Sequence, residues 1–189
     1  GDGSGVKLKF ADVEQGWHLN HPDLPSGIQL IHGINHNLPH GTALLGIVVA
    51  QDNGIGCVGI TPNLRSAMVS SIWPDSRTDY PDRYQAILAA IAKLEFGDVL
   101  LLETQIDAKG YYPGNDKLDW YGGLPAEVDS PLFELIQTAT SNGIIVVEAA
   151  GNGGWDLDAF DPYAAPHWTK DSGAIMVASV DAPPGRSGY

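Results

Sequence analysis

The chain has 189 residues, a length that suits one domain burying about 70% of the surface of the unfolded chain. Hydrophobic residues make up 43% of it and charged residues 17%, which is a globular composition. Ten Lys and Arg against 23 Asp and Glu give a formal net charge of −13, which argues against nucleic acid and anionic membranes as partners. This acidic balance fits a soluble, secreted, extracellular protein, and no apolar run is long enough to span a membrane. Its single cysteine excludes an internal disulfide.

The first half of the chain predicts two strands and one helix. Alternating residues predict a strand at residues 6–11, which ends at an acidic turn over residues 12–16. Residues 18–39 are rich in His, Asn and Pro and predict a loop. A buried helix is predicted at residues 42–50, and a strand at residues 65–72.

The second half continues the alternation of helices and strands. Amphipathic spacing predicts a helix at residues 84–95, and Ser130 is expected to cap a second helix that ends at residue 141. Apolar runs predict buried strands at residues 98–102, 144–149 and 174–180.

The order of these elements predicts the fold class. Strands that alternate with helices imply an α/β fold, with a parallel sheet flanked by helices on both faces. The only long loop predicted in the second half covers residues 106–128. We find no internal repeat and no linker, so residues 1–189 are expected to form one domain or part of one.

Five segments, in order along the chain, resemble motifs of the subtilisin-like serine peptidases, the subtilase family. The family's histidine motif resembles HGTALLGIVVA at residues 40–50, and its acidic motif resembles VEQGWHLNHPDL at residues 13–24. The strand that leads to its oxyanion-hole asparagine resembles VVEAAGNGG at residues 146–154. The family's order also fits the Asn-Gly-Ile-Gly run at residues 53–62 and AIMVASVDA from residue 174.

The resemblance implies a subtilisin-like catalytic domain that is incomplete at its C-terminus. The family's Gly-Thr-Ser-x-Ala-x-Pro segment follows the last strand, and no serine of this chain has that context. We therefore expect the nucleophilic serine beyond residue 189, in a C-terminal companion segment. Without it, the chain is expected to be inactive.

The implied activity is endopeptidase cleavage of a polypeptide by an acid–His–Ser triad. A serine hydroxyl is a weak nucleophile, so a neutral imidazole must take its proton and later return it to the leaving amine. The resemblance assigns this role to His40. It assigns to Asn152 the stabilisation of the oxyanion.

Two acids are candidates for orienting the imidazole. The family's spacing, counted back from residues 21–24, gives Glu14, whereas counting forward from residues 3–6 gives Asp12. Residues two apart on a strand point to the same face. We favour Glu14 because Gly16 permits a sharp turn after it, and Asp12 remains the alternative. The other acid is expected to be structural or to share the hydrogen-bond network.

Two segments of the chain are expected to line the substrate site. The resemblance assigns this role to Glu103, Thr104, Gln105, Ala149, Ala150 and Gly151. The last three are expected to line the pocket for the side chain before the scissile bond. Glu103 departs from the family's Ser-Leu-Gly strand, and its carboxylate is expected to favour basic or small side chains.

The resemblance also implies a structural calcium site. The matching positions are Asp23, Gln51, Asn53, Ile55 and Cys57. Asp23 and Asn53 would supply side-chain oxygens and the other three backbone carbonyls, a hard-oxygen set that suits Ca²⁺.

Two competing interpretations remain. His32, His36 and His40 recur every four residues, as in a zinc hydrolase, but the intervening glycine, asparagines and proline disfavour the helix that would bring them together. The other is a subtilisin-like domain that has lost its nucleophile and binds peptides or a partner protein.

Overall fold

The computed structural model describes residues 7–75, 80–107, 123–154, 157 and 171–179. Its centre is a six-stranded parallel sheet in the order β2-β3-β1-β4-β7-β8. The strands of this sheet are β1 (Phe10–Glu14), β2 (Gln29–His32), β3 (Ala67–Ser71), β4 (Val99–Leu102), β7 (Ile145–Ala149) and β8 (Ile175–Val177). A separate antiparallel pair consists of β5 (Gln105–Asp107) and β6 (Gly123–Pro125).

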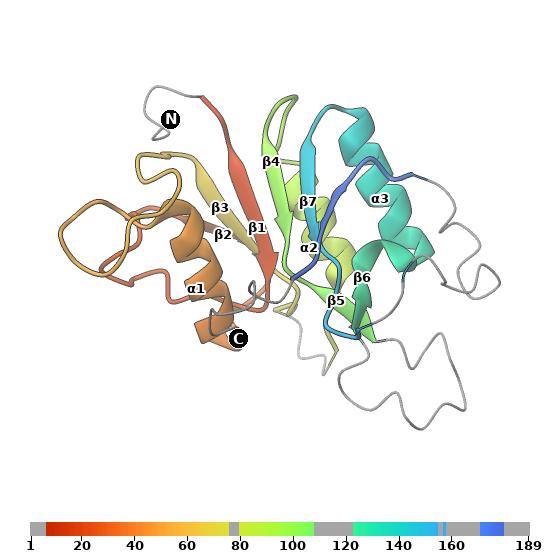
Figure 1. Ribbon diagram of the computed structural model, residues 1–189, viewed down its shortest axis with the longest axis horizontal. Coiled ribbons are helices and arrows are strands. Elements are labelled where there is room, and N and C mark those ends of the chain that lie inside the picture. The colour runs from red at the N-terminus through yellow and green to blue at the C-terminus, as the bar shows by residue number, and fades with distance from the viewer. Residues whose placement is uncertain (1–6, 76–79, 108–122, 155–156, 158–170, 180–189) are drawn as a thin grey trace, which may run out of the picture.

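Helices lie on both faces of the large sheet, which confirms the predicted α/β class (Figure 1). The three α-helices are α1 (Leu38–Val49), α2 (Arg83–Ile91) and α3 (Ser130–Ser141). A short 3₁₀ helix, η2 (Ala126–Val128), connects β6 to α3. Within the described ranges, no helix has the length and apolar character needed to cross a membrane.

Alternation along the strands divides the core into two clusters. Ala11 and Val13 of β1 face α2 and α3, in the larger cluster. Phe10 faces α1, where it packs with Leu45 and Val49. Because successive side chains point to opposite faces, the two acids of β1, Asp12 and Glu14, also lie on the α1 face.

The structure corrects several predicted boundaries. The first strand begins four residues and ends three residues later than predicted, so both acids lie within β1 rather than in a turn after it. Helix α1 begins at Leu38 instead of residue 42, which puts His40 inside its first turn. Asp129, not Ser130, caps α3, since its carboxyl accepts the Leu132 N–H at 3.2 Å.

Three strands were missed because they lie in segments predicted as loops. β2 falls within residues 18–39 and β6 within residues 106–128, and β5 begins at Gln105, one residue before the second predicted loop. Each has only three or four residues, too few to show a clear alternation. The last predicted strand is shorter, since β8 covers three residues, and residue 180 lies outside the described part.

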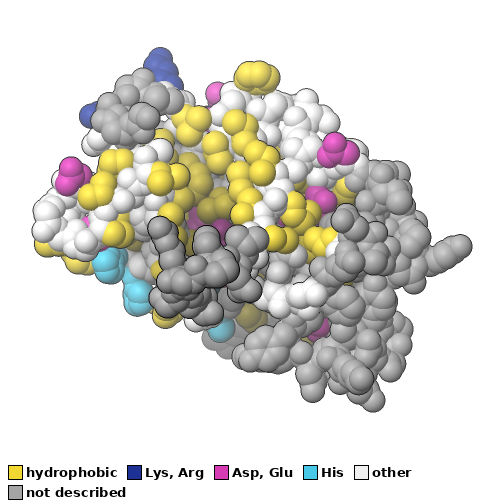
Figure 2. Space-filling view, in the orientation of Figure 1, with side chains coloured by type: hydrophobic (Ala, Val, Ile, Leu, Met, Phe, Trp, Pro, Cys, Tyr) yellow, Lys and Arg dark blue, Asp and Glu magenta, His cyan; other side chains and the backbone are white. Residues whose placement is uncertain are grey.

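The face of the sheet that carries α1 is only partly covered. The cluster under α1 includes residues of β1 and β3, and Val99 and Leu101 of β4 pack against it, but no described helix lies over β7 and β8 on this side. Apolar side chains of these strands and of α1 stay exposed there: Ile47 (60%), Ile145 (44%), Ile175 (55%) and Val177 (51%). Figure 2 shows hydrophobic side chains gathered on this face.

The opposite face of β7 contains a buried pair of acids. Glu148 is fully buried, and its Oε1 accepts the Glu127 backbone N–H at 2.9 Å. The Glu127 carboxylate accepts the Ser172 hydroxyl. Burial, reinforced by the charge of Glu127, raises the pKa of Glu148 to about 8. Glu148 therefore joins β7 to η2, and the Glu127 carboxylate joins η2 to the segment before β8.

This raised pKa predicts a pH dependence of stability. Between pH 4.5 and about 8 the unfolded chain loses the Glu148 proton while the folded chain keeps it, so stability falls as pH rises through this window. Glu148→Gln should reduce this loss of unfolding free energy. The loss is worth up to a few kcal/mol, at about 1.4 kcal/mol per pKa unit. Melting temperatures of the full-length protein at pH 5 and pH 8 measure the effect. Glu134→Gln, an exposed site on α3, is the matched control, and an unchanged pH dependence in Glu148→Gln would contradict the assignment.

Candidate active site

The carboxyl ends of the parallel strands bring a histidine and a glutamate together. His40 Nδ1 donates to Glu14 Oε2 at 2.8 Å, and the Glu14 side chain is 3% exposed against 58% for that of His40. The other Glu14 oxygen accepts the Gln15 backbone N–H at 2.6 Å. Both carboxylate oxygens are therefore fixed, and the imidazole is held by Nδ1 with much of its ring open to solvent.

Burial raises the pKa of Glu14, and the Gln15 amide, His40 and Arg83 act against that shift. The hydrogen bond from His40 thus offsets part of the cost of burying the Glu14 carboxylate. An acid in this position orients an imidazole and stabilises its protonated form.

The other candidate acid, Asp12, has a different partner. Its Oδ2 accepts the indole N–H of Trp17 at 2.7 Å, deep in the α1 side of the core. Burial raises the pKa of Asp12 well above its usual value, and the Trp17 bond only partly opposes this. Of the two acids that the sequence left open, Glu14 contacts His40 and Asp12 fastens the Trp17 loop.

A cavity of about 480 Å³ lies in front of this pair. Its walls are the segments that follow β1, β4 and β7, together with the start of α1, which carries His40. The predicted residues in its wall are Glu14, His40, Glu103, Thr104, Gln105, Ala149, Ala150, Gly151 and Asn152. β1, β4 and β7 deliver these segments, since the carboxyl ends of parallel strands share one edge.

Two side chains keep the walls of the cavity in place. Gln105 Oε1 accepts the Asn152 backbone N–H at 2.9 Å, which ties the segment after β7 to β5. Thr104 is buried, and its hydroxyl oxygen accepts the Nε–H of Arg83 at 3.0 Å. Gln105 and Thr104 therefore shape the cavity by holding two other residues of its wall, Asn152 and Arg83.

Arg83 is a cavity residue that the sequence analysis missed. It is the first residue of α2, next to the N-cap Asp82, and it lines the same cavity as His40. Burial lowers the pKa of Arg83, and the charges of Asp129, Asp107 and Glu14 oppose the shift. An arginine at a helix start is not diagnostic in a sequence, because its position depends on which strand the helix packs against.

Comparison with known proteins identifies the family. The subtilase family model matches residues 29–187. This chain belongs to the subtilase family. Its sequence is 25% identical to Subtilisin DY of Bacillus licheniformis over 190 residues, covering 98% of this chain and 61% of that protein. It is 29% identical to Subtilisin BL of Lederbergia lenta over 157 residues, covering 80% of this chain and 49% of that protein.

A further relative is the Major intracellular serine protease of Bacillus subtilis (strain 168). The identity is 26% over 163 residues, which cover 79% of this chain and 44% of that protein. The chain thus spans between 44% and 61% of the lengths of these three relatives.

In this subtilase, the residues of the expected calcium site gather around one carboxylate. Asp23 is buried, and its Oδ2 accepts the Cys57 backbone N–H at 2.9 Å. Its Oδ1 is buried without a hydrogen-bond partner. The Gln51 N–H bonds to the Asp23 carbonyl at 2.8 Å, and Asn53 Oδ1 accepts the Ile55 N–H at 3.1 Å. The unpartnered oxygen fits a site that accepts a cation.

The three histidines of the zinc interpretation do not meet. His32 Nδ1 bonds to the Ser71 carbonyl at 2.9 Å, and the His36 ring lies 4.4 Å from the ring of Trp73. His40 contacts Glu14 instead. In the described ranges, no group of three or more His, Cys, Asp or Glu side chains is placed to hold a metal ion.

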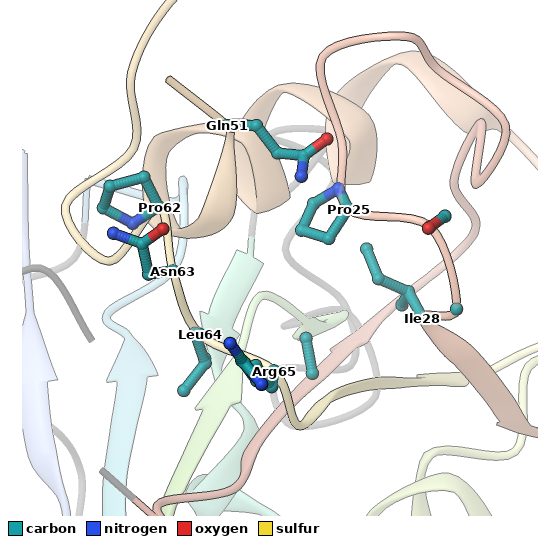
Figure 3. Close-up of a pocket in the computed structure, with 10 residues that line it drawn as sticks. Pro25, Ile28, Gln51, Pro62, Asn63, Leu64 and Arg65 are labelled. Carbon is teal, nitrogen blue, oxygen red and sulfur yellow. The ribbon is translucent and has the colours of Figure 1, made fainter. Parts of the chain in front are cut away.

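A second hollow, of about 260 Å³, lies at the opposite edge of the sheet (Figure 3). Its walls are the segments before β2 and β3, with Pro25, Ile28 and Arg65, and the residue Gln51 after α1. None of the predicted catalytic residues lines it. The predicted catalytic residues therefore lie away from this hollow.

Two glycines of α1 test how tightly His40 is positioned. A Cβ on Gly41 would lie 2.5 Å from the Gly16 carbonyl oxygen and 2.9 Å from Glu14 Cγ, whereas a Cβ on Gly46 would meet nothing within 4 Å. Gly41→Ala should destabilise the protein by about 1–3 kcal/mol. Gly46→Ala should stabilise it by about 0.5–1 kcal/mol, because glycine weakens a helix interior. Urea unfolding of both variants measures this, and equal effects would contradict the close approach of α1 and β1.

Proposed function

We propose that this subtilase is a serine endopeptidase whose polypeptide substrate binds in the cavity in front of His40. The observation that carries the proposal is the 2.8 Å bond between His40 and Glu14 at a cavity also lined by Asn152. An imidazole held by a buried carboxylate, with an amide side chain nearby, is the arrangement that acyl transfer requires.

The chemistry divides among three residues of this chain and one serine. His40 Nε2 takes the proton of the serine hydroxyl as the oxygen attacks the scissile carbonyl, and then gives it to the leaving amine. Glu14 accepts the Nδ1–H throughout and stabilises the imidazolium that forms. The Asn152 amide donates to the oxyanion of the tetrahedral intermediate. A water molecule then releases the acyl group by the same route in reverse.

We propose that the serine belongs to a segment beyond residue 189 and that this segment packs on the open face of the sheet. The three relatives are all longer than this chain. Ile47 of α1, Ile145 of β7 and Ile175 of β8 are exposed, and Figure 2 shows hydrophobic side chains gathered on this face. An exposed apolar surface of this kind favours a covering segment.

The catalytic roles predict different effects for the two buried acids. In the full-length protein, His40→Ala and Glu14→Gln should each lower kcat for peptide hydrolysis by about 10⁴-fold or more. Asp12→Asn is the matched control: it should cost less than about tenfold, because an amide oxygen can still accept the Trp17 N–H.

A fluorophosphonate probe completes this experiment. Labelling of a serine beyond residue 189, lost in His40→Ala, supports the peptidase. Undiminished turnover by His40→Ala refutes the assignment, and a full-length protein with no labelled serine favours the alternative of a peptide- or partner-binding domain.

We also propose that Ca²⁺ binds at the loop around Asp23. The free Oδ1 of Asp23 would supply one ligand, Asn53 a side-chain oxygen, and Gln51, Ile55 and Cys57 carbonyl oxygens. Ca²⁺ accepts six to eight oxygen ligands, so waters would complete the shell. The role of the ion would be to fasten the loop between α1 and β3.

Calcium binding predicts a response to chelation. EGTA should lower the melting temperature of the full-length protein, and Ca²⁺ in excess of its Kd by about 100-fold should restore about 2.7 kcal/mol. Asp23→Asn should remove the response, while Asp52→Asn, an exposed acid in the same loop, should keep it. A melting temperature that is the same in EGTA and in Ca²⁺ would exclude the site.

The extracellular location remains a proposal that rests on the acidic composition. One of the three relatives is named as an intracellular protease, and the names of the other two give no location. Detection of the protein in culture medium rather than in lysed cells would decide between the two locations.

A further inference from the structure

One carboxylate in the cavity has no role in the proposed chemistry. Glu103 directly follows β4, and its backbone N–H donates to the Val13 carbonyl at 3.1 Å. This bond fixes it beside the end of β1, on the wall of the cavity that holds His40. Its carboxylate interacts electrostatically with both His40 and Glu14, so it lies at the reacting end of the cavity.

The other charged groups of this cavity already have partners. Glu14 is bonded to His40 and to the Gln15 amide. Arg83 donates to Thr104 and is balanced by the charges of Asp129, Asp107 and Glu14. The half-buried Glu103 carboxylate, in contrast, makes no hydrogen bond or ion pair with any residue that the structure describes. Burial raises the pKa of Glu103, because removal from water is only partly compensated by His40.

We propose that Glu103 recognises a lysine or arginine side chain of the polypeptide, at a residue adjacent to the scissile bond. This inference rests on the proposed function. A partly desolvated carboxylate without a counter-ion gains a charge-assisted hydrogen bond when a cationic side chain enters. The position of the recognised substrate residue follows from His40. His40 must reach the scissile bond, and Glu103 lies within electrostatic range of His40.

The charge of the molecule favours the same substrates. With a net charge of −13, the chain attracts cationic peptides over distances up to the Debye length, about 8 Å at physiological salt. An anionic substrate side chain at Glu103 would meet repulsion from both Glu103 and Glu14. Recognition by Glu103 is therefore expected to give a 10- to 100-fold preference, on the order of the value of a hydrogen bond to a charged group.

The test uses the full-length protein and pairs of peptides that differ only by lysine or norleucine, just before or just after the scissile bond. In at least one pair, the wild type should show a kcat/KM ratio of Lys to norleucine of about 10 or more. Glu103→Gln should bring this ratio close to one, and Glu103→Lys should invert it. The ratio within one variant is insensitive to general damage to the site, since damage lowers both rates. Glu134→Gln, on the exposed face of α3, should keep the wild-type ratio.

A wild-type ratio near one in both pairs, or a ratio that persists in Glu103→Gln, overturns the proposal. If no peptide is cleaved, the proposed function fails, and the same peptides still test Glu103 through their binding, measured by fluorescence anisotropy. Tighter binding of the lysine peptide, abolished by Glu103→Gln, supports Glu103 independently of turnover. Equal binding of the two peptides refutes it.

Discussion

The bond between His40 and Glu14 depends on how closely α1 approaches β1. A buried carboxylate is costly unless it is fully bonded, and both oxygens of Glu14 have partners within this structure. The helix reaches it only because Gly41 has no side chain to strike the Gly16 carbonyl. The same approach seats Trp17 over Asp12, so one contact between a helix and a strand organises both acids.

Acidic residues are used here for two opposite purposes. Glu148 is buried with its pKa raised to about 8, and its neutral form holds η2 against β7. Glu14 is buried beside an imidazole and an arginine, which favour its charged form. Glu103 lies between these cases, half-buried and near His40 without a bonded partner. The three carboxylates differ in their surroundings: Glu148 is buried beside another acid, Glu14 is bonded to His40, and Glu103 is near His40 without a bond to it.

The uneven cover of the sheet connects the fold to the family. On one face, α2 and α3 pack over a continuous core, whereas on the other α1 leaves β7 and β8 bare among the described residues (Figures 1 and 2). The bare strands end at the cavity that contains Asn152. A segment that covered them would therefore also border the reacting centre, which is where the proposed mechanism needs its serine.

The sequence by itself determined the parallel α/β class, the subtilase resemblance and the list of candidate site residues, because buried strands and short motifs are local patterns. It did not locate β2, β5 and β6, which are too short to show a period. It also could not distinguish Glu14 from Asp12 by the direction of their side chains, since residues two apart on a strand point to the same face of the sheet. Only the tertiary structure distinguished them, because their partners, His40 and Trp17, come from separate segments whose approach is set by packing. For the same reason, Arg83 and the unpaired state of Glu103 could be seen only once α2 and β4 were placed together.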